Sequence, residues 1–382
     1  MKKYKKEQWN LTWLKSEPVN LIWKILSSRG AQVYFVGGCV RDTVQGREIK
    51  DVDIATDSLP SEVIELAQSF GLKVIKTGYT HGCISVVIKK QCFEVTTFRS
   101  DLITDGRHSK VRFSSKILDD ARRRDFTMNA IYMTIKGEIF DPISGWEDLV
   151  NNRVRFIGKP EKRIHEDYLR VLRYFRFLAI YGKHVSSAHS ATIDACSNAI
   201  PGLKKLSHDR VWDEFQKILS ADNPYLSFKL MHDCGVLKEI LPFADIKKLK
   251  RFLEIEEIFK VKCNVINRLV ALNKYYVLIW IEKFPLKKNE RRWLNELLTC
   301  LKDSSSLRVK GHKYGFNLAT AALAISKSDL GMQSVEDDLS EIKYGSLKKF
   351  PIKIEDFLQL IPPSKELGDE LRKLKDIWFA SN

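Results

Sequence analysis

The sequence predicts an α+β protein, in which an N-terminal head combines a mixed sheet with helices and the rest of the chain is helical. Two observations indicate this division. Short segments rich in β-branched residues alternate with helical segments as far as residue 157, and from residue 161 onward the hydrophobic pattern is helical. The chain has 382 residues, of which 44% are hydrophobic, so it can form several domains with their own cores.

The first elements of the head are organised around a glycine pair. Gly37 and Gly38 end an apolar strand and allow the chain to turn directly into a helix. Gly30 ends the helix before this strand, and Gly46 ends the helix after it. We therefore expect a helix, a strand, a helical turn, a second strand and a second helix over Pro18–Leu26 and residues 33–37, 40–44, 51–56 and 58–71.

Further along the head, the pattern predicts a hairpin and a polar loop. Cys83–Ile88 and Cys92–Phe98 are rich in β-branched residues and are separated by three residues, as in a β-hairpin. Ser100–Ser115 is polar and charged, so we expect a mobile loop there. A helix containing Asp125–Tyr132 and a short strand at Glu138–Phe140 complete the head.

Beyond the head, helical periodicity extends to the end of the chain. Gly311, Gly331, Gly345 and Pro362–Pro363 are expected to interrupt the last helices. Seven helices are expected before these breaks, over Glu161–Tyr181, Ser186–Ala199, Asp209–Leu219, Pro224–Cys234, Ile246–Phe259, Asn264–Phe284 and Asn289–Lys302.

Charge and cysteine usage restrict the class of protein. Lys and Arg exceed Asp and Glu by 64 − 48 = 16, an excess that suits a polyanionic partner such as RNA or DNA. The seven cysteines form no Cys-x-x-Cys pair, so we expect free thiols and a reducing compartment. The most apolar run, around Tyr275–Ile281, is shorter than the about 20 residues of a membrane span. These features predict a soluble, cytoplasmic protein without a membrane partner.

Asp51 and Asp53 are the first candidate functional residues. They lie two apart on a predicted strand, so both carboxylates face the same side of the sheet. Two such carboxylates repel each other unless a cation lies between them, and hard oxygen ligands suit Mg²⁺. Considered alone, the pair is more often two solvated acids on a surface strand.

The glycine pair makes a functional role for the two aspartates more plausible. Gly37 and Gly38 let the backbone approach a phosphate closely, and the helix that follows offers N–H groups to an anion. Arg41, one turn into that helix, can donate charge-assisted hydrogen bonds to phosphate oxygens. The alternative is a tight structural turn.

Two further groups complete this part of the prediction. Glu94 lies on the second hairpin strand, where a third acid can complete a two-metal site; otherwise it is a solvent-facing strand residue. Arg122, Arg123 and Arg124 open the predicted helix that contains Asp125. Cations at a helix N-terminus oppose the helix dipole, which points to a bound anion, unless these arginines are solvated or salt-bridged. Asp125 could accept a hydrogen bond from a ribose hydroxyl.

A second informative stretch lies in the helical region. Asp167 and Arg170 are three residues apart, so a continuous helix places them side by side, with Arg173 flanking them and Arg176 farther round. A carboxylate beside a guanidinium offers an acceptor and donors together, which can pair with the edge of a base. The alternative is an ordinary helix salt bridge.

The ordered motifs VGGCVRD, DVDIATD, TGYTHGCISVVI, EVTTFR, DGRH, RRDFTMNA and EDYLRVLRYFRF closely resemble those of the class II tRNA nucleotidyltransferases, the CCA-adding enzymes. LSHDRVWDEFQKIL and LMHDCGVLKEILP continue the resemblance, which is strong over residues 31–242 and general beyond. It implies a nucleotidyltransferase head of the DNA polymerase β type over residues 31–157. We expect a helical extension over residues 1–30 before the head, a neck over 158–222 after it, and a helical body and tail over 223–382 that binds tRNA.

The resemblance also implies residue roles. Asp51 and Asp53 are expected to hold two catalytic Mg²⁺ ions. Glu94 stays a candidate catalytic acid on the grounds given above, its place beside the Asp pair. Asp167 and Arg170 are expected to replace a nucleic-acid template by mimicking Watson–Crick pairing with C or A. One departure from the family is Cys83, which stands where threonine is usual. The remaining residues expected to contact the incoming nucleotide are Gly37, Gly38, Arg41, Arg124, Asp125, Arg173 and Arg176.

The implied activity is addition of C, C and A to the 3′ end of tRNA from CTP and ATP, with release of pyrophosphate. A bacterial poly(A) polymerase shares this head, but TGYTHGCISVVI resembles the CCA-adding version of its region. Presence of the Ser100–Ser115 segment disfavours addition of CC alone, whereas addition of A alone stays open. A non-catalytic RNA-binding protein is the remote alternative. The sequence does not specify an oligomeric state.

Overall fold

The computed structural model describes residues 9–105, 108–184, 188–330, 336–348 and 365–381. Its contacts divide the chain into two compact units, Met1–Glu214 with Asp233–Val236, and Phe215–His232 with Leu237–Asn382. The finer division expected at residues 30, 157 and 222 stays a prediction. Within the described ranges, every helix is too short or too polar to cross a bilayer.

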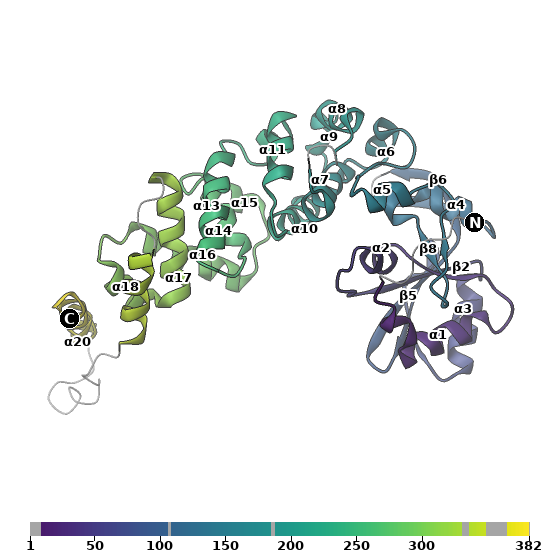
Figure 1. The fold of residues 1–382 in the computed structure, drawn as a ribbon, viewed down its shortest axis with the longest axis horizontal. Helices are drawn as coiled ribbons and strands as arrows, with labels where there is room; N and C mark the ends of the chain where they lie inside the picture. The colour runs from purple at the N-terminus through teal and green to yellow at the C-terminus, as the bar shows by residue number, and fades with distance from the viewer. Residues whose placement is uncertain (1–8, 106–107, 185–187, 331–335, 349–364, 382) are drawn as a thin grey trace. The chain divides into compact units, whose positions relative to one another are not determined.

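The N-terminal unit contains a seven-stranded mixed sheet with helices around it (Figure 1). The strand order is β3-β4-β5-β2-β1-β8-β9. Neighbouring strands are antiparallel except β2 and β5, which run parallel. The strands of this sheet are β1 (Val33–Val36), β2 (Val52–Thr56), β3 (Lys73–Gly78), β4 (Cys83–Ile88), β5 (Gln91–Thr97), β8 (Tyr132–Met133) and β9 (Ile139–Phe140).

The predicted hairpin is confirmed and is extended by one strand that the pattern did not predict. β4 and β5 are joined by Lys89 and Lys90, which both have positive φ angles of 47° and 69°. Two residues of positive φ form the primed turn that matches the twist of a hairpin. β3 pairs with the outer side of β4. It was missed because KVIKTG is short and half polar, so its strand conformation depends on the neighbouring strand.

The loop predicted over Ser100–Ser115 is wrong. β6 (Arg99–Asp105) pairs antiparallel with β7 (His108–Phe113) as a separate two-stranded sheet, while Gly106 lies outside the described residues. A polar composition does not prevent such pairing, because the hydrogen bonds of a two-stranded ribbon are made by the backbone.

The helix predicted over Asp125–Tyr132 is also wrong. Helix α4 ends at Arg123, and Arg124 already has extended backbone angles of φ −65° and ψ 162°. The chain then makes one 3-10 turn and enters β8, where Tyr132 pairs with Val36 of β1. Pairing with the sheet has overridden the local helical tendency of this segment.

The single helix predicted over Glu161–Tyr181 is divided into two. α6 ends at Glu166, and Asp167 has φ −157° and ψ 109°, which no helix accommodates. α7 begins at Leu169. The described helices and 3-10 turns of this unit are η2 (Thr12–Lys15), α1 (Glu17–Ser27), α2 (Gly38–Val44), α3 (Pro60–Ser69), η3 (Tyr79–His81), α4 (Ile117–Arg123), η4 (Thr127–Asn129), α5 (Trp146–Val150), α6 (Pro160–Glu166), α7 (Leu169–Tyr181), α8 (Ser190–Asn198) and α9 (Ile200–Leu203).

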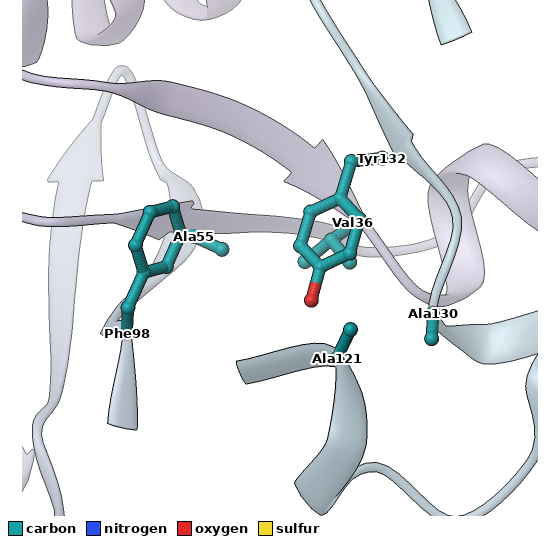
Figure 2. Close-up of a cluster of buried hydrophobic side chains, with 6 residues drawn as sticks. All are labelled: Val36, Ala55, Phe98, Ala121, Ala130 and Tyr132. Carbon is teal, nitrogen blue, oxygen red and sulfur yellow. The ribbon is translucent and has the colours of Figure 1, made fainter. Parts of the chain in front are cut away.

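One buried cluster ties the central strands to α4 (Figure 2). Val36 directly precedes the glycine pair, Ala55 follows Asp53 by two residues, and Ala121 belongs to α4. Figure 2 shows the ring of Tyr132 beside Val36, with its hydroxyl directed toward Ala121. Because this packing leaves little freedom to the backbone, it holds the residues next to it in place. The cluster consists of Val36, Ala55, Phe98, Ala121, Ala130 and Tyr132.

In its described residues, the second unit contains helices joined by turns and loops, and no strand. The single helix predicted over Asn264–Phe284 is two helices, because the chain is extended at Asn273, with φ −174° and ψ 102°. α10, at the boundary of the units, is His208–Leu219. The others are α11 (Tyr225–Asp233), α12 (Val236–Ile240), α13 (Ile246–Ile258), α14 (Val265–Leu272), α15 (Val277–Lys283), α16 (Lys288–Lys302), α17 (Leu307–Leu330), α18 (Glu336–Leu347) and α20 (Lys365–Ser381).

Two glycines that were expected to break helices instead pack helices together. Gly311 lies inside α17 and Gly345 inside α18. A Cβ on Gly311 would lie 2.2 Å from the carbonyl oxygen of Ile342, and one on Gly345 would lie 1.9 Å from that of Arg308. Absence of a side chain lets the two helix backbones approach closely. The expected breaks at Gly331 and Pro362–Pro363 lie outside the described residues.

Candidate active site

The turn between β1 and α2 forms one wall of the site. Gly37 has φ 74° and ψ −125°, a conformation that side-chain-bearing residues rarely adopt. A Cβ at this position would lie 3.5 Å from Oδ2 of Asp53 and 3.6 Å from Nη1 of Arg124. Gly37 therefore lies against a carboxylate and a guanidinium, both predicted from the sequence as site residues. Gly38 begins α2 and lies next to Arg41.

The predicted carboxylates lie together at adjacent strands. Asp53 on β2 is directly beside Glu94 on the parallel strand β5, and Asp51 immediately precedes β2. Burial and the charges of Glu94 and Asp51 together raise the pKa of Asp53 to about 6, against the lowering effect of Arg124 and Arg41. Burial and the neighbouring acids therefore disfavour ionised Asp53, and a bound cation would favour it.

This donor set fits a divalent metal ion that also binds substrate. Among the described residues, no three His, Cys, Asp or Glu side chains form a metal cage by themselves. Mg²⁺ characteristically uses one or two carboxylates and completes its shell with water and substrate phosphates. Asp51 and Asp53 are such carboxylates. Glu94 is exposed, and the thiol of Cys83 donates to its Oε1 over 3.5 Å.

Arg41 is held in one orientation. Its Nε and Nη2 donate to the carboxylate of Asp42 over 3.0 and 3.1 Å, and its Nη1 donates to Oδ1 of Asn129 over 2.6 Å. Only 8% of Arg41 is exposed. A guanidinium has five N–H groups, so these three bonds still leave donors for an oxyanion.

Arg124 is held by Asp120, which is fully buried. Arg124 donates from Nε and Nη2 to Oδ2 of Asp120 over 3.1 and 2.9 Å, and the hydroxyl of Tyr132 donates to the same oxygen over 2.7 Å. Burial alone would raise the pKa of Asp120, but Arg124 and Arg123 outweigh it and lower this pKa to about 2. The carboxylate therefore stays charged and fixes Arg124 beside Gly37.

The basic cluster has a different origin from the one expected. Arg122 and Arg123 lie in the last turn of α4, not at the start of a helix. Cations are favourable at a helix C-terminus, so the helix dipole gives no reason to expect an anion there. Contact of Arg124 with the nucleotide stays a prediction, which its position next to Gly37 supports.

Asp125 and Arg173 form a partly buried ion pair between the head and α7. Nε of Arg173 donates to Oδ2 of Asp125 over 3.0 Å, while Nδ2 of Asn129 donates to Oδ1 over 2.9 Å. Burial opposes ionisation of Asp125, but Arg173 and these hydrogen bonds hold its pKa well below the usual range. Arg176, one turn further along α7, donates to Oε1 of Glu214 over 3.2 Å.

Asp167 and Arg170 do not pair with each other. Asp167 lies in the break between α6 and α7, so the predicted side-by-side placement on one helix is wrong. Its carboxylate accepts from Nη2 of Arg210 over 2.7 Å and from the Leu169 amide over 3.1 Å. Arg170 donates to Glu166 and to the carbonyl of Arg163. Each member therefore has its own supporting partner.

The sequence reasoning missed the residues that support the predicted ones. Asp120 and Asn129 hold the two head arginines, Arg163 donates to the carbonyls of Arg123 and Arg124 over 2.5 and 2.8 Å, and two residues of α10 support the helix-borne residues. Asn129 lies in RRDFTMNA, and the residues of α10 lie in LSHDRVWDEFQKIL. Their position in these family motifs could have identified them as supporting residues. The supporting residues are Asp120, Asn129, Arg163, Arg210 and Glu214.

Comparisons with known proteins identify the family of this chain. A model of the poly A polymerase head domain matches residues 33–155, and a model described as the probable RNA and SrmB-binding site of polymerase A matches residues 189–247. The human mitochondrial CCA tRNA nucleotidyltransferase 1 is 36% identical, with 96% of this chain and 87% of the human protein aligned. The CCA-adding enzyme of Staphylococcus epidermidis is 32% identical, with 83% and 78% aligned.

Solved structures agree on the fold. The Bacillus stearothermophilus CCA-adding enzyme in complex with CTP superimposes with a TM-score of 0.76 at 26% identity, covering 94% of this chain and 92% of that one. The Thermotoga maritima enzyme complexed with tRNA_CCA shares the fold, with a TM-score of 0.68 at 21% identity over 98% and 95%. The predicted fold class and family resemblance are confirmed. Because relatives that align along almost the whole chain are CCA-adding enzymes, this chain belongs to the class II CCA-adding nucleotidyltransferases of the tRNA nucleotidyltransferase/poly(A) polymerase family.

Proposed function

We propose that this protein adds C, C and A to the 3′ end of tRNA, from CTP and ATP, without a nucleic-acid template. The observation that carries the proposal is the convergence of Asp53 and Arg124 on the glycine turn at Gly37, in a chain whose full-length relatives carry the names of CCA-adding enzymes. The relatives of known structure were solved with CTP and with tRNA_CCA.

In the proposed reaction, the 3′-hydroxyl of the RNA attacks the α-phosphate of the nucleotide. The new bond is a phosphodiester, the bond to the β-phosphate breaks, and the hydroxyl proton is lost as pyrophosphate leaves. Arg41 and Arg124 bind the triphosphate oxygens, since both guanidinium groups are fixed with N–H donors to spare. The backbone of Gly37 and Gly38 lies beside these two arginines, so its N–H groups are proposed to bind the same phosphates.

Asp51 and Asp53 would hold the divalent cations, two Mg²⁺ ions in this proposal, with Glu94 beside them. Such ions, when bound, lower the pKa of an attacking hydroxyl and stabilise triphosphate charge. Asp53 contributes because the neighbouring acids make its ionised form costly without a cation.

Base choice is proposed for Asp167 and Arg170. Both are oriented by partners within the protein, Asp167 by Arg210 and Arg170 by Glu166. A base that offers matching donors and acceptors can exchange with or add to these bonds, whereas a mismatched base leaves buried polar groups unpaired. Asp125 is proposed to accept from the ribose.

Two arginines of α7 complete the proposed nucleotide contacts. Arg173 holds Asp125, and Arg176 is itself held by Glu214. Both guanidinium groups are anchored on a carboxylate, so they can contact the incoming nucleotide without reorganising.

The helical second unit is proposed to bind tRNA through its phosphates and shape. The chain carries an excess of 16 positive charges, and double-stranded RNA is recognised largely by shape and backbone contacts.

Incubation of purified protein with Mg²⁺ and tRNA lacking CCA tests the proposal. With CTP and ATP together, we expect tRNA ending in CCA, and with CTP alone we expect CC. Incorporation of A only, or of long A tracts, would identify an A-adding enzyme or a poly(A) polymerase instead. Asp53→Asn should reduce turnover by about a thousandfold, because it removes a proposed metal ligand. The matched control is Asp57→Asn, which changes an acid just beyond the same strand that instead accepts from the side chain and amide of Gln32.

Chelation tests the metal part separately. EDTA should abolish incorporation while leaving the far-ultraviolet circular dichroism unchanged, and Mg²⁺ should restore incorporation. Incorporation that persists after complete chelation would contradict the proposed role of Asp51 and Asp53.

The compartment is also a proposal. All seven cysteines are free thiols, which supports a reducing compartment, and we propose the cytoplasm. The human and mouse relatives are named as mitochondrial enzymes. Cell fractionation with mitochondrial and cytosolic markers distinguishes the two.

A further inference from the structure

Tyr181, at the C-terminal end of α7, contacts two arginines of the head with its ring. Its ring centroid is 4.3 Å from Cζ of Arg41 and 5.0 Å from Cζ of Arg47. The side chain is buried, with 7% of the residue exposed. A guanidinium over an aromatic face is attracted by the ring, more strongly where water is excluded. The ring therefore restricts the plane in which the Arg41 guanidinium can lie.

The hydroxyl of Tyr181 contacts Asp42, a carboxylate that also binds Arg41. It donates to Oδ1 of Asp42 over 3.1 Å, and this carboxylate in turn accepts from Nε and Nη2 of Arg41. Burial raises the pKa of Tyr181 to about 12, so the hydroxyl keeps the proton that it donates. One side chain thus contacts both the face of the guanidinium and the carboxylate that orients its edge.

The end of α7 is itself fixed against the head. Nη2 of Arg47 donates to the carbonyl of Ile180 over 2.6 Å, which satisfies one of the last carbonyls of the helix. Phe177, one turn earlier, has its ring centroid 5.2 Å from Cζ of Arg41. Tyr181 therefore has a firm base from which to position Arg41.

We propose that Tyr181 is a positioning residue for Arg41 and thereby for the triphosphate. The inference rests on the proposed role of Arg41 in binding nucleotide phosphates. Helix α7 then has two roles. Its middle carries Arg173 and Arg176, and its C-terminal residue, Tyr181, orients Arg41, the arginine proposed to bind the triphosphate. Since CTP and ATP have the same triphosphate, loss of Tyr181 should weaken the binding of both substrates by the same factor.

The probe that isolates this effect is inorganic tripolyphosphate, which has the phosphates of a nucleotide but no base or ribose. Binding to the full-length protein in Mg²⁺ is measured by isothermal titration calorimetry. Tyr181→Leu removes the ring and the hydroxyl and should weaken binding about tenfold. Tyr181→Phe keeps the ring and should lose no more than about threefold.

Tyr174→Leu is the matched control on the same helix. Tyr174 is at least as buried as Tyr181, but its ring packs on Phe126 and Phe156 and its hydroxyl accepts from the His189 amide. This variant should lower thermal stability and leave tripolyphosphate affinity unchanged. Equal weakening by Tyr174→Leu and Tyr181→Leu would show a general effect of destabilisation and would overturn the inference.

A double-mutant cycle with Arg41→Ala supplies a second readout. Without the guanidinium, Tyr181→Leu should have little further effect on affinity, because its target is gone. In steady-state kinetics, Tyr181→Leu should raise KM for CTP and ATP by the same factor, while the preference for CTP over UTP stays as in wild type. Independent, additive effects, or a changed base preference, would overturn the inference.

Failure of the proposed function is distinguishable from failure of this inference. If the wild type binds tripolyphosphate with the expected pattern of variants but extends no tRNA, the activity is wrong and the positioning role stands. If the wild type adds CCA but Tyr181→Leu binds tripolyphosphate as wild type does, the positioning role is wrong. A wild type that binds no tripolyphosphate also overturns the positioning role, because there is then no phosphate binding for Tyr181 to support.

Discussion

At the scale of single residues, the site depends on a position that has no side chain. Gly37 combines a positive φ with two close polar neighbours, Asp53 and Arg124. A methyl group there would be strained by its backbone angle, and by filling the space beside Asp53 and Arg124 it would also hinder the approach of a phosphate to the turn. Those two penalties can be separated, because Gly71 has a similar φ of +70° and a Cβ added there would have no neighbour within 4 Å.

Gly37→Ala should therefore reduce kcat/KM for CTP by about a hundredfold, since small displacements of reacting groups have effects of this size. Both Gly37→Ala and Gly71→Ala should lose about 1–2 kcal/mol of stability through strain at positive φ. Steady-state kinetics and thermal melting of both variants make the comparison. An activity loss shared equally by Gly71→Ala would contradict a specific role of the glycine turn.

Asp120 provides a residue-scale prediction about pH. Its pKa of about 2 in the folded protein lies below the ordinary value of 3.8, so ionised Asp120 stabilises the fold above about pH 4, and this stabilisation is lost as the pH falls toward 2. The shift corresponds to about 2 kcal/mol. The stability difference between wild type and Asp120→Asn should shrink by about 1 kcal/mol between about pH 5 and pH 3. Hydrogen exchange at the β2 amides, corrected for intrinsic rates, measures it; a difference independent of pH contradicts the assignment.

At the scale of elements, the site is built from ends and breaks of helices. α4 stops at Arg123, and Arg163 of α6 donates to the carbonyls of the last two arginines there. The interruption between α6 and α7 places Asp167 outside the regular helix, where Arg210 of α10 reaches it. Each irregular point is held by a side chain from another element, which keeps the functional groups in defined positions.

The hairpin that carries Glu94 gives an element-scale prediction. Lys89 and Lys90 both occupy positive φ, which Asn and Gly adopt with less strain. Replacing the pair by Asn-Gly should stabilise the N-terminal unit by about 1 kcal/mol and raise its melting temperature by about 2–4 °C. The exposed ion pair of Lys89 with Glu17 would be lost at little cost. Differential scanning calorimetry measures the shift, and an unchanged or lower melting temperature would contradict the turn assignment.

At the scale of the whole molecule, the chain forms two compact units and carries a formal net charge of +16. If the proposed binding of tRNA is carried by phosphate contacts, its affinity must fall with salt, because each neutralised phosphate releases counterions. We expect the affinity for tRNA to drop at least about tenfold between about 50 and about 200 mM salt. Filter binding across this range tests it. A flat salt dependence would contradict binding through phosphates.

The sequence predicted the parts of the site that depend on local chemistry. The strand, glycine turn and helix around Gly37 were predicted because a glycine pair and an apolar run act over a few residues. The closeness of Asp53 to Glu94 could be predicted as well, since both residues lie on predicted strands. Arg122 and Arg123 were placed at the wrong end of a helix, because the boundary of α4 is decided by pairing of Tyr132 with β1.

The sequence by itself determined the family, the α+β division and the identity of the chemical groups, since these follow from motifs and periodicity. Only the tertiary structure decided which charges are paired. Asp167 joins Arg210 rather than Arg170, across 43 residues of sequence, and Tyr181 joins Arg41 across 181 − 41 = 140. Such pairs form because a buried charged or polar group needs a partner in space, and a sequence pattern carries no record of which distant partner it meets.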